Sequence, residues 1–110
     1  MTAVPRSSDV DFDQYDTDAI NQKDKAHFLH PWQIFDTFAA EGALPIAAAE
    51  GAYIYDSNGT RYLDAVGGLW CTNIGMGREE MADAIADQVR QMAYASPFVD
   101  MTNIPAATLA

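Results

Sequence analysis

The chain has 110 residues, of which 49% are hydrophobic and 20% charged, values typical of one small folded domain. Sixteen Asp and Glu residues face six Lys and Arg residues, which gives a formal net charge of -10. Such a chain repels phosphate backbones and anionic lipid surfaces, which disfavours a nucleic-acid partner and a membrane-surface role. The single cysteine allows no disulfide framework, and no signal peptide or apolar span is visible. Both features favour a cytoplasmic protein.

The first part of the chain is polar and acidic. We expect residues 1–16 to form a flexible arm and residues 17–110 to form the folded part. A short helix is predicted from Ala19 to about Leu29, and Pro31 ends it because the residue before a proline avoids the helical region. Four large apolar residues follow within seven positions, and so dense a group is predicted to be buried: Trp32, Ile34, Phe35 and Phe38.

The clearest local signal is a β-hairpin. Residues 52–56 and 60–64 are both rich in aromatic and β-branched side chains. Asn58 and Gly59 lie between them and are the residue types that accept the positive φ angles of tight turns. A short apolar run at 45–50 precedes the hairpin.

The remaining residues alternate between glycine-rich and helical sequence. Residues 65–77 contain four glycines, so we expect a sharply bent loop rather than a regular helix. A helix is predicted from Arg78 or Glu79 to about Ala93, with a buried apolar stripe at Met81, Ile85, Val89 and Met92. Residues 103–110 resemble a helix start that stops after one turn. Such a short helix is marginal, and one hairpin with a few helices leaves an open sheet edge, so we expect a piece of a longer chain.

The side chains that most often carry metal or nucleophile chemistry lack partners in this sequence. His27 and His30 share a helix face, but two further ligands at suitable spacing are absent, so packing at the helix end is favoured over a metal site. No base accompanies Cys71, which is therefore interpreted as a small buried hydrophobic residue rather than a nucleophile.

Cofactor-binding groups are equally hard to find. Lys23 and Lys25 lie on the polar side of the first helix and are predicted to be solvated, which argues against a Schiff-base lysine. Gly67-Gly68 lacks the strand–glycine–helix pattern of a phosphate-binding loop, so a tight corner is favoured there.

Three segments nevertheless resemble one family. Residues 27–32 read His-Phe-Leu-His-Pro-Trp, residues 49–64 contain Glu-Gly-Ala-Tyr and Asn-Gly-Thr-Arg-Tyr-Leu-Asp, and residues 67–75 read Gly-Gly-Leu-Trp-Cys-Thr-Asn-Ile-Gly. These segments resemble the class III, or omega-transaminase, family of pyridoxal-phosphate-dependent aminotransferases, and the last is similar to the subgroup that uses pyruvate. The resemblance covers most of the chain, from about Asp24 onward.

The resemblance implies a fold and an activity. The fold class would be α/β of fold type I, and this segment would contribute an α+β part of the small domain, a hairpin plus helices, with the lead-in to the large domain. The family works as a homodimer and uses pyridoxal 5'-phosphate to move an amino group from an amine or omega-amino acid donor to pyruvate. The cofactor is the electron sink, and the protein orients the reactants.

The resemblance also assigns site residues. Leu69 and Trp70 match positions that line the substrate pocket, and Trp32 matches an aromatic residue that reaches the same pocket; plain core packing is the alternative for both tryptophans. Phe98 lies near aromatic residues that the family contributes across the dimer, but Pro97 departs from that pattern.

The family's Schiff-base lysine, the acid that pairs with the pyridine nitrogen and the phosphate cup match no residue of this sequence, so no catalytic, cofactor-binding or metal residue is assigned. We expect the segment alone to be inactive. The alternative is a short non-catalytic module that docks on a full-length homologue. The preferred donor is left open.

Overall fold

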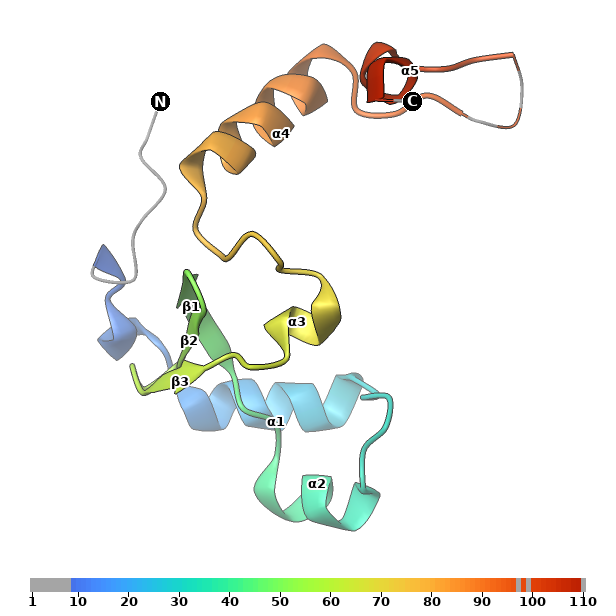
Figure 1. The fold of residues 1–110 in the computed structure, drawn as a ribbon. Helices are drawn as coiled ribbons and strands as arrows, with labels where there is room; N and C mark the ends of the chain where they lie inside the picture. Colours follow the sequence, from blue (N-terminus) through green and yellow to red (C-terminus); the bar gives the residue numbers. More distant parts are fainter. Residues whose placement is uncertain (1–8, 97, 99, 110) are drawn as a thin grey trace. The chain divides into compact units, whose positions relative to one another are not determined.

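The computed structural model describes residues 9–96, 98 and 100–109 of the chain. The chain divides into two compact units, Met1–Gly77 and Arg78–Ala110, each described by itself below (Figure 1). The first eight residues of the expected arm lie outside the described residues. The later part of the arm contains a 3-10 turn, η2, at Phe12–Gln14. The Phe12 ring lies 6.3 Å from the Tyr55 ring, between ring centroids.

Helix α1 comprises Thr17–His27. It begins two residues before the predicted start because the carboxylate of Asp16 accepts a hydrogen bond from Ala19 N at 2.9 Å and caps the helix. It ends at His27 because Phe28 already has extended backbone angles, φ -116° and ψ 131°. Helix α1 lies between the sheet and helix α2 in the view of Figure 1.

Helix α2 comprises Phe35–Glu41 and follows a turn that contains Trp32. The prediction that the aromatic group here is buried is wrong for this chain by itself: Trp32 is 92% exposed and Phe35 66% exposed. Phe38 is partly covered, with its ring 5.0 Å from the His30 ring. The described residues leave the others exposed.

The sheet has three antiparallel strands in the order β1-β2-β3, with bounds Ile46–Glu50, Tyr53–Asp56 and Arg61–Leu63. The predicted hairpin is confirmed as β2 and β3, and the apolar run that precedes it in the sequence forms β1. Gly59 has φ +80° in the turn, as the Asn-Gly signal indicates.

Burial in the described residues is confined to the hairpin turn. No hydrophobic residue among them is buried, whereas Asp56 and Ser57 are only 4% and 2% exposed. The carboxylate of Asp56 accepts hydrogen bonds from Asn58 N at 2.9 Å, Thr60 N at 2.8 Å and the Tyr62 hydroxyl at 2.9 Å. The buried contacts are therefore polar, and an apolar core is missing from the part of the chain that the structure describes.

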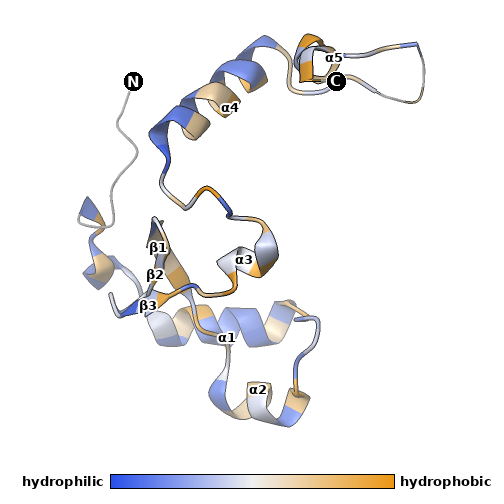
Figure 2. Cartoon of the chain, viewed as in Figure 1, coloured by the Kyte–Doolittle hydropathy of each residue, from blue (hydrophilic) through white to orange (hydrophobic). Residues whose placement is uncertain are grey.

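The second unit contains helix α4, Glu79–Gln91, and helix α5, Ile104–Leu109, so both predicted helices are confirmed. Asn103 caps α5 by accepting a hydrogen bond from Ala106 N at 2.8 Å. Hydrophilic and hydrophobic stretches alternate along α4 (Figure 2). Its predicted stripe has the expected spacing but is not buried here: Ile85 and Val89 are 55% and 57% exposed. Among the described helices, none has the length and apolarity needed to cross a membrane.

Candidate functional site

The glycine-rich segment after β3 is a loop, and both of its ends bond to the backbone of the adjacent residues Gly51 and Ala52. At its start, Asp64 N donates to Ala52 O at 2.9 Å. At its end, Met76 and Gly51 exchange two backbone hydrogen bonds, each of 2.9 Å. The loop is therefore closed onto the β1–β2 connection, as in compact surface loops that often carry function.

The loop contains a short turn of helix, α3, at Gly67–Trp70, and this turn is left-handed. Its four φ angles are +61°, +59°, +65° and +65° in chain order. The predicted absence of a regular helix is correct, but the left-handed turn was not foreseen. Glycine accepts such angles readily, whereas Leu69 and Trp70 each lose about 1–2 kcal/mol in them because Cβ crowds the following carbonyl.

Cys71 lies directly after the left-handed turn. Its thiol donates a hydrogen bond to the Gly68 carbonyl oxygen. The prediction that this cysteine is a buried hydrophobic residue is wrong, because the side chain is exposed in this chain. A methyl group added at Gly68 would lie 3.1 Å from Thr72 Cγ2, so the side chains after the turn pack closely against its glycines.

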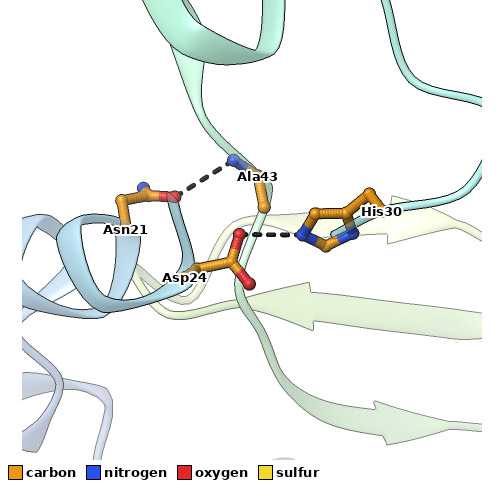
Figure 3. A network of polar contacts seen from close by, with 4 residues as sticks. All are labelled: Asn21, Asp24, His30 and Ala43. Carbon is orange, nitrogen blue, oxygen red and sulfur yellow. Dashed lines mark hydrogen bonds and ion pairs between the residues drawn. The ribbon is translucent and has the colours of Figure 1, made fainter. Parts of the chain in front are cut away.

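Trp32 lies on a second loop, between α1 and α2, with φ +60°. One contact holds this loop to α1, and a second holds the segment after α2 to the same helix (Figure 3). His30 Nε2 lies 2.8 Å from a carboxylate oxygen of Asp24, and Asn21 Oδ1 accepts a hydrogen bond from Ala43 N at 3.1 Å. The prediction that His30 shares a helix face with His27 is wrong, because α1 ends at His27, but its contact with Asp24 agrees with a structural rather than a metal-binding role. No cluster of three or more metal-ligating side chains occurs among the described residues.

A hollow of about 380 Å³ lies beside this second loop. Its lining includes Lys25, His30 and Phe38, and none of the three predicted substrate residues contributes to it. Leu69 and Trp70 are adjacent in the left-handed turn, while Trp32 belongs to a different loop of the same unit. The segment therefore presents these side chains without forming a closed pocket around them.

The backbone singles out the same residues as the sequence. Among the described residues, three that are not glycine have positive φ: Trp32, Leu69 and Trp70. They are also the three residues predicted to line the substrate pocket. Positive φ at a residue other than glycine costs free energy, and such residues cluster at functional sites. The side chains of Trp32, Leu69 and Trp70 are largely exposed, at 92%, 55% and 78%.

The residues that the structure describes do not by themselves form a site for pyridoxal phosphate. Lys23 is exposed on α1, and the Lys25 ammonium donates to the Ala39 carbonyl oxygen at 2.9 Å. Neither lysine occupies the buried, apolar setting that is typical of a Schiff-base lysine.

Comparison with known proteins decides the family. The family model of "Aminotransferase class-III" matches residues 37–110, well over half of the chain. The chain belongs to the class-III aminotransferases. This aminotransferase segment is 40% identical over 84 residues to putrescine–pyruvate aminotransferase of Pseudomonas aeruginosa, covering 76% of the segment and 18% of that protein. It is 32% identical over 94 residues to adenosylmethionine-8-amino-7-oxononanoate aminotransferase of Staphylococcus aureus, covering 86% and 21%.

Solved structures agree with the family. The segment superposes on an (S)-enantioselective omega-transaminase from Thermomicrobium roseum with a TM-score of 0.83 at 36% identity, covering 86% of the segment and 21% of that chain. A transaminase from the marine bacterium Virgibacillus gives a TM-score of 0.78 at 36% identity, covering 83% and 21%. The predicted fold, the α+β amino-terminal part of a fold type I transferase, is confirmed. The segment spans about a fifth of the length of these relatives.

Sequence reasoning missed two polar residues that shape the loops. Asp64 was assigned only to the end of a strand, although its carboxylate accepts a hydrogen bond from Gly68 N at 2.8 Å. Asp24 was not assigned as the partner of His30. Asp64 lies four residues before the amide that it accepts from, outside the two-residue spacing of the common Asp turn, so no local signal indicated this contact.

Proposed function

We propose that this segment forms part of the substrate pocket of a pyruvate-coupled transaminase. In the complete protein, the longer transaminase chain that carries this segment, Leu69, Trp70 and Trp32 would present apolar walls to the side chain of an amine or omega-amino acid donor. One observation supports this proposal above the others: the positive φ angles of non-glycine residues fall on these three positions.

The complete protein would contribute what the segment lacks. Pyridoxal 5'-phosphate would supply the electron sink, and residues outside this sequence would hold it. The exposed apolar side chains support such a completion, since Trp32, Trp70 and Phe98 are 92%, 78% and 90% exposed here. Large apolar side chains this exposed are typical of surfaces that contact other polypeptide. The homodimer expected from the resemblance remains a prediction, and so does the cytoplasmic location favoured by the single cysteine and the lack of a visible signal peptide.

The test is a transamination assay on the complete protein. Pyruvate is supplied with three classes of donor (a diamine, a beta-amino acid and an arylalkylamine), and alanine formation is measured. We expect alanine from at least one class, and we expect Trp70→Ala to change the ratio of kcat/KM between a small and a bulky donor by about tenfold, the effect of reshaping one apolar wall. No alanine from any donor would contradict the activity.

The second candidate function is a non-catalytic module that docks on a full-length homologue. The lack of any buried hydrophobic residue among the described residues favours a covering partner here too. The two functions differ in one observable. A module would be a stable product of 12.0 kDa that co-purifies with a full-length transaminase, whereas a segment of an enzyme would be found only within the longer chain.

A further inference from the structure

The left-handed turn needs something to hold it. Four successive residues, Gly67 to Trp70, have φ between +59° and +65°, and the last two carry large side chains. Left-handed backbone is unfavourable for L-residues and occurs as single residues rather than as a full turn. Such a turn persists only where surrounding contacts determine it.

Asp64 supplies those contacts from both its backbone and its side chain. Its carbonyl oxygen accepts a hydrogen bond from Gly67 N at 3.2 Å, and its carboxylate accepts one from Gly68 N at 2.8 Å. Its own N–H donates to Ala52 O at 2.9 Å. Asp64 therefore connects the edge of the hairpin to both glycine amides at the start of the turn.

The carboxylate contact is the strongest candidate among these for a specific role. A hydrogen bond to an ionised acceptor is roughly twice as strong as a neutral one. Two hydrogen bonds lie inside the turn, from Trp70 N to Val66 O and from Cys71 N to Gly67 O, at 3.0 Å each. Such bonds can form in a helical turn of either hand. They do not connect the turn to the sheet, whereas Asp64 does.

We propose that Asp64 is a positioning residue for the donor pocket. Its carboxylate selects the left-handed turn and thereby sets the direction in which Leu69 and Trp70 are presented. The role of those two side chains in donor binding rests on the proposed function. The effect of Asp64 on the backbone of the turn rests only on the hydrogen bonds described above.

The experiment compares Asp64→Ala with Asp64→Asn in the complete, cofactor-loaded protein. The amide oxygen of asparagine still accepts the Gly68 N–H, so this conservative variant should keep the turn. For Asp64→Ala we expect kcat/KM for a bulky donor to fall by about tenfold, the effect of losing a hydrogen bond to a charged group. We expect the loss mainly in KM, while kcat for a small donor and cofactor loading stay near those of the unsubstituted protein.

A matched control separates positioning from stability. Asp16 makes the same kind of contact elsewhere, with its carboxylate accepting from Ala19 N at 2.9 Å. Asp16→Ala should lower the melting temperature as a lost cap does, without changing the ratio of kcat/KM between donors. In a Trp70→Ala background, Asp64→Ala should add little further change in that ratio, because both substitutions act on the same wall.

Three results would overturn the proposal. One is an equal effect of Asp64→Ala on both donors, as for Asp16→Ala. Another is full additivity of Asp64→Ala with Trp70→Ala. The third is a crystal structure of Asp64→Ala in which Leu69 and Trp70 keep positive φ. If the unsubstituted complete protein forms no alanine, the proposed function fails, and the crystal structure alone then decides the role of Asp64: negative φ supports it and positive φ refutes it.

Discussion

Asp56 is the residue whose ionisation matters most for the hairpin. Burial by itself would raise the pKa of this carboxyl, but hydrogen bonds from Thr60 N, the Tyr62 hydroxyl and Asn58 N outweigh burial and hold the pKa below its ordinary value of 3.8. The stabilisation that the carboxylate gives is therefore fully present above pH 3.8 and is lost as the pH falls through the folded-state pKa.

Tyr62 is the residue whose ionisation affects the hairpin at high pH. The hydrogen bond that its hydroxyl donates to Asp56 raises the pKa of Tyr62 above 10.0, so its contribution is present below pH 10.0 and is lost as the pH rises through the folded-state pKa. We expect the difference in absorbance at high pH between the complete protein and its Tyr62→Phe variant to titrate above pH 10.0. Asp56→Asn should lower that midpoint. A midpoint at or below 10.0 before this substitution would contradict the pairing.

Two glycines with equal φ form a natural pair for testing the left-handed turn. Gly51 and Gly68 both have φ +59°, but an added methyl group meets nothing within 4 Å at Gly51 and lies 3.1 Å from Thr72 Cγ2 at Gly68. Gly51→Ala should reduce the free energy of unfolding by about 1 kcal/mol, the penalty of positive φ for an L-residue. Gly68→Ala should reduce it further, as measured by urea unfolding of the complete protein. Equal losses would show that the turn has room to spare.

At the scale of elements, the sequence predicted those whose signals are local. The hairpin depends on Asn58-Gly59, and α5 depends on the Asn103 cap, both of which act within a few residues. The left-handed turn could not be predicted in this way. It depends on Asp64 being fixed by Ala52, a contact that exists only after the hairpin has formed.

For the candidate site, the sequence predicted the residues but not their backbone conformation. Its residues followed from the Gly-Leu-Trp-Cys and His-Pro-Trp segments, because the family resemblance is carried by side-chain identity. Its backbone did not, since positive φ at Leu69, Trp70 and Trp32 is unfavourable by local preference and is imposed by the surrounding contacts. The exposure of Trp32, Phe35 and Cys71 was also missed, because burial depends on contacts between distant parts of a fold, and the described residues supply too few of them.

The connection between α1 and α2 offers a prediction at this scale. The pair of His30 Nε2 and the Asp24 carboxylate, 2.8 Å apart, holds the loop that carries Trp32. His30→Ala should speed hydrogen exchange across residues 28–41 by about tenfold, the effect of one lost hydrogen bond of about 1.4 kcal/mol. His30→Gln keeps an N–H near the position of Nε2 and should retain most of the protection. Equal exchange in both variants would assign the restraint to other contacts.

For the whole molecule, the central feature is the missing apolar core. No hydrophobic residue among the described residues is buried, yet α4 carries a regular apolar stripe that includes Ile85 and Val89, 55% and 57% exposed. A helix with such a stripe gains most of its stability from packing. We therefore expect the 110-residue chain alone to unfold without a cooperative transition and to bind a hydrophobic dye.

The same stripe gives a comparison between two contexts. Ile85→Asp places a charge on a helix face that is open in the 110-residue chain and, as we propose, covered in the complete protein. The substitution should change the isolated chain little and should destabilise the complete protein by about 3 kcal/mol or more, as an unpaired buried charge does. Thermal unfolding of both forms measures the difference. A neutral effect in both would mean that α4 is not covered.

The most direct measurement of the central claim is the intact mass of the native protein that carries these residues. If they are part of a transaminase, the mass will be several times 12.0 kDa, in keeping with a segment that spans about a fifth of its relatives. A native mass of 12.0 kDa would contradict the claim, because these residues would then lack the lysine and the phosphate site that transamination requires.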